Sequence, residues 1–203
     1  LTLCKSLKNE SSVSDDFKTD VNSWMISYYS GYYILDDFWH EYPSVDTDNL
    51  TKCDAGKLIE TLISFNMYSQ AYELTKEYGC CRASAAKLLK MADYILKNVS
   101  DMHDEVIDAV TAYIFSEHIY NEPVLMYMAE YFNGTNEEMY NVWKACISFG
   151  VNVKHLSDRL LAQMMYTGVH SGRFTEVFTD YYNKTPDMLI VKAYLSYNSQ
   201  FYL

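Results

Sequence analysis

Glycine and basic residues are scarce in this chain of 203 residues. It has 7 glycines, no glycine-rich phosphate loop and no G-x-S-x-G stretch, which argues against a nucleotide-binding loop and a serine-hydrolase nucleophile. Lysine and arginine total 16 against 27 acidic residues, giving a formal net charge of -11. A protein that neutralises nucleic-acid phosphates needs a basic stripe, and none is present. We therefore exclude nucleic acid as a partner, and the acidity also argues against an anionic membrane surface.

Long apolar runs and paired cysteines are missing as well. No stretch of about 18 apolar residues is long enough to cross a membrane, and the first residues show no signal-peptide pattern. The five cysteines are scattered without C-x-x-C spacing, which is typical of buried thiols in a reducing compartment. The sequence predicts a cytoplasmic segment without membrane insertion. The missing initiator methionine and the apolar ending QFYL suggest a fragment of a larger protein.

Apolar and aromatic residues are abundant. Hydrophobic residues make up 49% of the chain and include 20 tyrosines, enough to offset the entropy of ordering, so disorder is excluded. In the first strong pattern, apolar residues recur at steps of three and four until Pro43 stops the run. This spacing predicts a helix of about 25 residues. Its expected buried stripe is Phe17, Val21, Trp24, Tyr28, Tyr32, Leu35, Trp39 and Tyr42.

Similar stripes continue along the chain, about ten helices in all, and the alternating β-branched runs of strands are absent. Helix punctuation supports this interpretation. Gly79 and Gly150 each follow a stripe as expected for a C-cap, and Thr135 with Glu138 has the spacing of a capping box. We predict a polar lead-in over residues 1–13 and a single all-α domain over residues 14–203.

The order of short helices favours an α-solenoid. Antiparallel helices joined by about 3–6 residues are what a tetratricopeptide-like or armadillo-like superhelix needs, because each unit buries its apolar face only against its neighbours. An acidic residue followed by tyrosine recurs close to the expected helix ends at 41–42, 77–78, 130–131 and 180–181. The spacing is uneven, so this is at most an irregular internal repeat. A globular helical bundle is the alternative.

The stretch ILDDFWHEY at 34–42 is the candidate metal site. All-α prenyl-diphosphate enzymes present aspartates on helices to hold magnesium, and a di-iron bundle needs inward carboxylates with Glu-x-x-His motifs. The helical period instead places Asp37 and Glu41 away from the apolar stripe, and no second metal motif exists. We expect Trp39 to be buried, Asp37 and Glu41 to be exposed, and no metal or cofactor to bind. The weak alternative ligands are Asp36, Asp37, His40 and Glu41.

Four segments carry a family resemblance. They are AYELTKEYG at 71–79, EYFNGTNEEMYNVWKACISF at 130–149, LSDRLLAQMMYT at 156–167 and AYLSYNSQFYL at 193–203. Together they resemble the C-terminal region of a family of very large, uncharacterised bacterial proteins from anaerobic Firmicutes. The phrase around Arg159 and Gln163 is the most specific, and the likeness spans roughly residues 60–203. It implies a helical-repeat segment of a long intracellular protein and brings no catalytic residues.

Three functions follow from these observations. The tyrosine-rich, acidic composition favours a non-catalytic scaffold that binds a protein or peptide in an aromatic groove. A purely structural spacer within the larger protein is one alternative. The other is an all-α metal-dependent enzyme, terpenoid-synthase-like or di-iron, which would require Asp36 or Asp37 to open into a cavity near other carboxylates. Since no catalytic motif is found, we expect no enzyme activity.

Overall fold

The computed structural model of the chain describes residues 2–32, 45–80, 83–98, 104–168, 172–184 and 187–199. These residues form eleven α-helices and contain no strand, which confirms the all-α prediction. The chain divides into two compact units, Leu1–Ile119 and Tyr120–Leu203, and each is described by itself. The single domain over residues 14–203 stays a prediction.

Unit 1 contains the first six described helices. They are α1 (Thr2–Lys8), α2 (Asp15–Tyr32), α4 (Lys52–Ser64), α5 (Tyr68–Tyr78), α6 (Ala85–Asn98) and α7 (Glu105–Ser116). Helix α1 packs on α2, α2 on α4, α4 on α5 and α6, α5 on α6, and α6 on α7. The predicted polar lead-in thus contains a helix. The predicted continuation of α2 to Tyr42 falls in residues 33–44, outside the described ranges.

The core face of α2 differs from the predicted stripe. Phe17 and Trp24 were expected inside, but they are 46% and 50% exposed. The buried residues are shifted around the helix and are Val21, Asn22, Met25, Ile26 and Tyr29. The prediction was wrong because aromatic residues occupy two edges of α2, while the true core line includes the polar Asn22. A polar residue is tolerated inside when its hydrogen bonds are satisfied.

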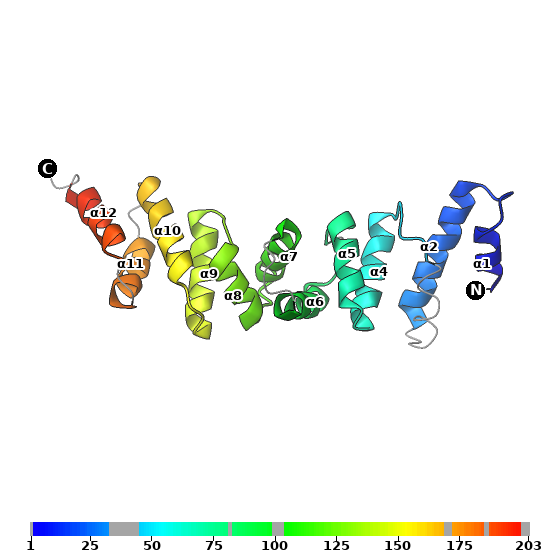
Figure 1. Ribbon diagram of the computed structural model, residues 1–203, viewed down its shortest axis with the longest axis horizontal. Coiled ribbons are helices and arrows are strands. Elements are labelled where there is room, and N and C mark those ends of the chain that lie inside the picture. Colours follow the sequence, from blue (N-terminus) through cyan, green and yellow to red (C-terminus); the bar gives the residue numbers. More distant parts are fainter. Residues whose placement is uncertain are drawn as a thin grey trace. The chain divides into compact units, whose positions relative to one another are not determined.

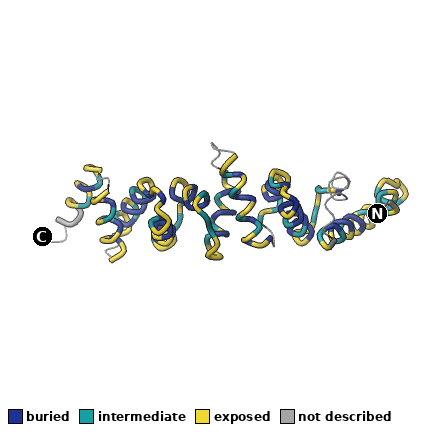
Figure 2. The backbone as a smooth tube through the Cα atoms, turned by 90° about the horizontal axis from the view of Figure 1, so that it is seen from below, coloured by how far each residue is buried: buried dark blue, intermediate teal, exposed yellow. Residues whose placement is uncertain are grey.

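Unit 2 contains the remaining helices. They are α8 (Glu122–Tyr131), α9 (Asn136–Phe149), α10 (Lys154–Tyr166), α11 (Gly172–Lys184) and α12 (Met188–Ser199). Helices α8, α9 and α10 lie side by side in chain order, and α10 also packs against α11 and α12 (Figure 1). Within each unit, the buried residues lie on helix sides that face neighbouring helices (Figure 2). This neighbour packing is compatible with a solenoid-like arrangement.

An internal repeat relates helices of the two units. The buried residues of α5 are Ala71, Tyr72, Leu74 and Thr75, and those at the start of α9 are Met139, Tyr140, Val142 and Trp143. The residue numbers of each pair, such as 72 and 140, differ by 68. The same offset relates Leu88 and Ala92 of α6 to Leu156 and Leu160 of α10, all buried. Burial therefore follows the 68-residue offset at these positions, although the acid–tyrosine pairs in the sequence are not regularly spaced.

Helix α9 begins and ends as predicted. The backbone N–H of Glu138 donates to Thr135 Oγ1 over 3.3 Å, and the backbone N–H of Thr135 donates to Glu138 Oε2 over 2.8 Å. This capping box satisfies two N–H groups that a helix start leaves unpaired. At the other end Gly150 has a φ of 75°, a left-handed conformation that glycine adopts without steric cost.

Candidate functional site

The predicted metal residues lie outside the part of the chain that can be described. Asp36, Asp37, His40 and Glu41 fall within residues 33–44, as does Trp39, so their predicted exposure and burial stay predictions. Across the described residues, no group of three or more His, Cys, Asp or Glu side chains is placed to hold a metal ion. None of the described helices has the length and apolar character needed to cross a membrane.

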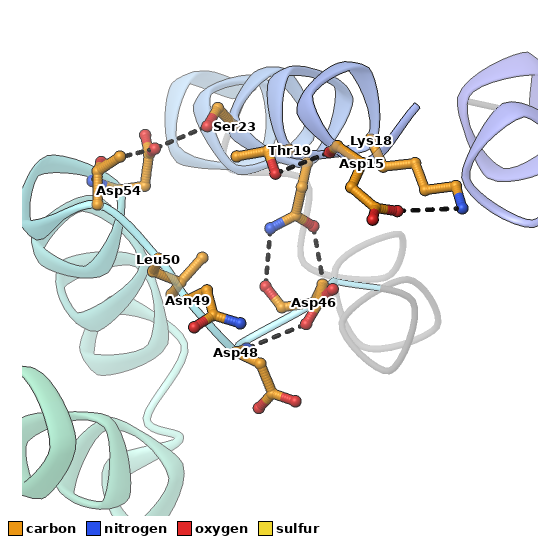
Figure 3. A pocket seen from close by; sticks show the side chains of 11 residues that line it. Asp15, Lys18, Thr19, Ser23, Asp46, Asp48, Asn49, Leu50 and Asp54 are labelled. Carbon is orange, nitrogen blue, oxygen red and sulfur yellow. Dashed lines mark hydrogen bonds and ion pairs between the residues drawn. The ribbon is translucent and has the colours of Figure 1, made fainter. Parts of the chain in front are cut away.

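A polar pocket of about 300 Å³ lies in unit 1 between α2 and the loop before α4 (Figure 3). Its lining residues are Asp15, Lys18, Thr19, Asn22, Ser23, Asp46, Asp48, Asn49, Leu50, Thr51 and Asp54. Leu50 is the single apolar residue among them, and none is aromatic. This pocket is therefore acidic, and its lining lacks the tyrosines expected of the predicted binding groove.

Asn22 fixes the pocket loop to α2. Its side-chain N–H group donates to the backbone oxygen of Asp46 over 2.7 Å, and its Oδ1 accepts from the backbone N–H of Asp46 over 2.9 Å. The ammonium of Lys8 donates to the same Oδ1 over 2.9 Å. Partial burial lowers the pKa of Lys8, because losing water disfavours its charged form. Sequence analysis missed Asn22, since a polar residue inside a helix has no signal in the apolar pattern.

Tyr78 fixes the other end of the same loop. Its hydroxyl donates to the backbone oxygen of Thr47 over 2.7 Å and accepts from the backbone N–H of Leu50 over 3.1 Å. Burial raises the pKa of Tyr78, because the ionised phenolate would lose water. Tyr78 thus holds the pocket loop in place and does not line the pocket.

Asp54 closes the pocket, and its carboxylate is already engaged. The hydroxyls of Ser23 and Thr51 donate to its Oδ2 over 2.7 and 2.8 Å, and the ammonium of Lys57 lies 3.6 Å from its Oδ1. The lining includes no histidine or cysteine. With four aspartates and one lysine in its lining, the pocket can attract cations.

Unit 2 has a second pocket, of about 290 Å³, where the turn before α10 meets α11. Lys154 and Lys184 both line it, and Lys184 forms an ion pair with Asp180 over 2.7 Å. The backbone N–H of Asp187 donates to the Tyr181 hydroxyl over 3.0 Å, near the same end of α11. This pocket contains charges of both signs and no aromatic side chain except Tyr181 among its lining residues.

Two tyrosines at equivalent positions of the repeat connect separate helices. In unit 1 the Tyr72 hydroxyl donates to Asp104 Oδ2 over 2.7 Å, and the Lys76 ammonium lies 4.7 Å from the Tyr72 ring centre. Asp104 is also the N-cap of α7, so the bond joins α5 to the start of α7. Burial, followed by the hydrogen bond to Asp104, raises the pKa of Tyr72.

Unit 2 repeats this arrangement with different partners. The Tyr140 hydroxyl donates to Glu176 Oε2 over 2.5 Å, which joins α9 to α11. Lys144 lies 5.7 Å and the Arg173 guanidinium 5.0 Å from the Tyr140 ring centre, within the range of a cation–π contact. The hydrogen bond to Glu176 is the main reason that the pKa of Tyr140 is raised. These tyrosines act as structural links between helices.

Arg159 and Gln163 hold the turn between α8 and α9. The Arg159 guanidinium donates to the backbone oxygens of Phe132 and Ala129 over 2.7 and 2.8 Å, and Gln163 donates to the backbone oxygen of Gly134 over 3.0 Å. Carbonyls at a helix end lack intrahelical partners, and a cation there also complements the helix dipole. The most specific phrase of the sequence resemblance is therefore explained by a structural role.

Three strongly exposed apolar side chains lie on α12. Leu189 is 75% exposed, Leu195 60% and Met188 58%. Val191 is buried, and Tyr194 stacks on Phe174 and Phe178 of α11 with ring centres 5.4 and 4.0 Å apart. Exposed apolar patches are typical of surfaces that meet another protein. The apolar spacing of this segment predicts Met188 and Leu195 in a core stripe, and that prediction is wrong.

Comparison with known proteins gives a family without an established role. A model for the N-terminal part of a family of unknown function, DUF5717, matches residues 1–102, and a model for its C-terminal part matches residues 104–203. The match thus begins at residue 1, where the sequence resemblance began near residue 60. No curated protein and no solved structure matches the chain.

Proposed function

The chain belongs to the DUF5717 family of unknown function, and we propose that it is a non-catalytic helical-repeat scaffold that binds a protein partner through α12. The observation that carries the proposal is the exposure of Met188, Leu189 and Leu195. These side chains share a helix that has one charged residue, Lys192. Helices that are apolar around most of their circumference are normally covered.

The packing of the other helices supports this assignment. In the pairs α4–α5, α6–α7, α8–α9 and α10–α11, the first helix packs on the second. Helix α12 follows as the next first helix, and in the described residues its packing is with α10 and, through Tyr194, with α11. The side of α12 that carries Leu189 and Leu195 is exposed. A partner protein would cover that side.

The wider setting is part of the proposal. We place the scaffold in the cytoplasm of a bacterium, as a tetratricopeptide-like segment of a larger protein, and the scattered cysteines and the sequence resemblance support this. The lining of the acidic pocket in unit 1 includes no histidine or cysteine, and two hydroxyls and Lys57 already engage the Asp54 carboxylate, which supports a role without catalysis.

The test is affinity purification from cells of the source organism with three baits. They are the wild-type chain, a Leu189→Glu/Leu195→Glu variant, and a Met126→Glu control. Met126 is 56% exposed on α8, so the control adds charge to a similarly exposed apolar site. We expect proteins that the wild type and the control retain and the α12 variant loses. Identical retention of a protein by all three baits would contradict binding through α12, and the absence of any specifically retained protein would favour a spacer.

A further inference from the structure

Two exposed helix faces of this chain have matching patterns. On α12, Met188, Lys192 and Leu195 are exposed at steps of four and three, so they share one face. On α2, Phe17, Asp20 and Trp24 are exposed at steps of three and four, so they also share one face. Each face has the order apolar, charged, apolar, and the two charges are opposite.

The two patterns coincide when the helices run antiparallel. Read backwards, α2 presents Trp24, Asp20 and Phe17 at relative positions 0, 4 and 7, and α12 presents Met188, Lys192 and Leu195 at the same relative positions. In this register Lys192 faces Asp20. Met188 faces the ring of Trp24, and Leu195 faces the ring of Phe17. Tyr28 stacks on Trp24 with ring centres 5.5 Å apart and extends the aromatic surface.

We propose that the partner on α12 is a second copy of this chain, which presents α2 in this antiparallel register. The inference rests on the proposed function and names its partner. Charge complementarity favours α2 over a second α12. Two α12 helices packed through this face would bring Lys192 of one copy toward Lys192 of the other, with no acid in either helix to offset them.

A contact of this type uses different surfaces on the two copies. After one contact forms, one copy still has an unused α12 face and the other an unused α2 face, so association continues beyond a dimer. The net charge of -11 repels copies at long range, and salt at physiological strength screens that repulsion over distances beyond roughly 8 Å. The contact is therefore expected to be concentration-dependent and moderate in affinity.

The experiment is sedimentation velocity of the full chain at physiological salt between about 1 and 200 µM. The wild type and the Met126→Glu control should both increase in average mass with concentration. Trp24→Glu alone and Leu189→Glu/Leu195→Glu alone should each stay monomeric, at least about tenfold weaker in self-association. An equimolar mixture of the two should form a 1:1 complex, because each retains one intact face.

Charge reversal provides a second, independent arm. Lys192→Asp and Asp20→Lys should each weaken self-association, and the double variant should recover it. Circular dichroism checks that these surface variants remain helical. A monomeric wild type across the range, or a mixture without a complex, would overturn the inference. If the wild type is monomeric while the α12 variant still loses proteins in the affinity purification, the proposed function stands and the second copy is the wrong partner.

Discussion

Helices α6 and α10 occupy equivalent places in the repeat, yet one pair of equivalent residues differs in both chemistry and burial. Position 91 is a fully buried methionine, and position 159, 68 residues later, is an arginine that binds the end of α8. A similar change separates Thr75 of α5 from Trp143 of α9, both buried. The repeat therefore keeps some inward positions, such as 75 and 143, while each unit fills the space with its own side chains.

The largest test of this comparison is truncation at positions 75 and 143. Trp143 donates to Ser157 Oγ over 3.0 Å and fills the core, so Trp143→Ala should cost about 3–5 kcal/mol of the free energy of unfolding. Thr75→Ala should cost about 1 kcal/mol, since it removes a methyl group and a local hydroxyl bond to Ala71. Urea unfolding followed by circular dichroism measures both. Equal losses of unfolding free energy in the two variants would contradict the idea that the two units fill this core position differently.

The second test places the residue type of position 91 in unit 1 at the equivalent position 159 in unit 2. Arg159→Met leaves the carbonyls of Ala129 and Phe132 without the guanidinium and should cost about 2–3 kcal/mol. Burial lowers the pKa of Arg159, but the guanidinium stays charged at all ordinary pH values. Hydrogen exchange should rise in the α8–α9 turn. Met91→Leu is the matched control and should cost under about 1.5 kcal/mol of the free energy of unfolding. Similar costs for the two variants would contradict different roles for positions 91 and 159.

The smallest expected effects concern the two linking tyrosines. Tyr72→Phe and Tyr140→Phe each delete one hydroxyl bond to a carboxylate, at about 1 kcal/mol near neutral pH. Both folded pKa values lie above the ordinary value of 10.0. Their contribution is therefore complete below pH 10 and is lost as the pH rises through the folded pKa, because the unfolded chain ionises first. Stability above pH 10 should fall less steeply in the double variant than in the wild type.

Local patterns in the sequence predicted much of the fold. Steps of three and four placed Leu58, Leu62 and Leu160 inside, and the capping box at Thr135 marked the start of α9 correctly. Such signals work because a helix start and an apolar stripe each depend on residues a few positions apart. The period alone could not choose between the edges of α2, where aromatic residues lie on more than one side.

The candidate sites depended on residues far apart in the chain and could not be predicted in the same way. Asn22 binds Asp46 across 24 positions, and Arg159 binds Phe132 across 27. Neither bond has a local motif, because the partner is a backbone group that any residue supplies. The exposed face of α12 was missed for another reason. Its apolar residues resemble a core stripe, and only the packing of neighbouring helices distinguishes a covered face from an open one.

The link between Tyr72 and Asp104 also bears on where this protein can be cut. The two family models meet between residues 102 and 104, a natural place to split a gene for expression. A split there would leave Tyr72 on one polypeptide and its acceptor on the other, and would remove α7 from the side of α6 on which it packs. A split between Ile119 and Tyr120 keeps both contacts within one polypeptide. The border between the two halves of the family therefore falls one helix before the boundary between the two compact units.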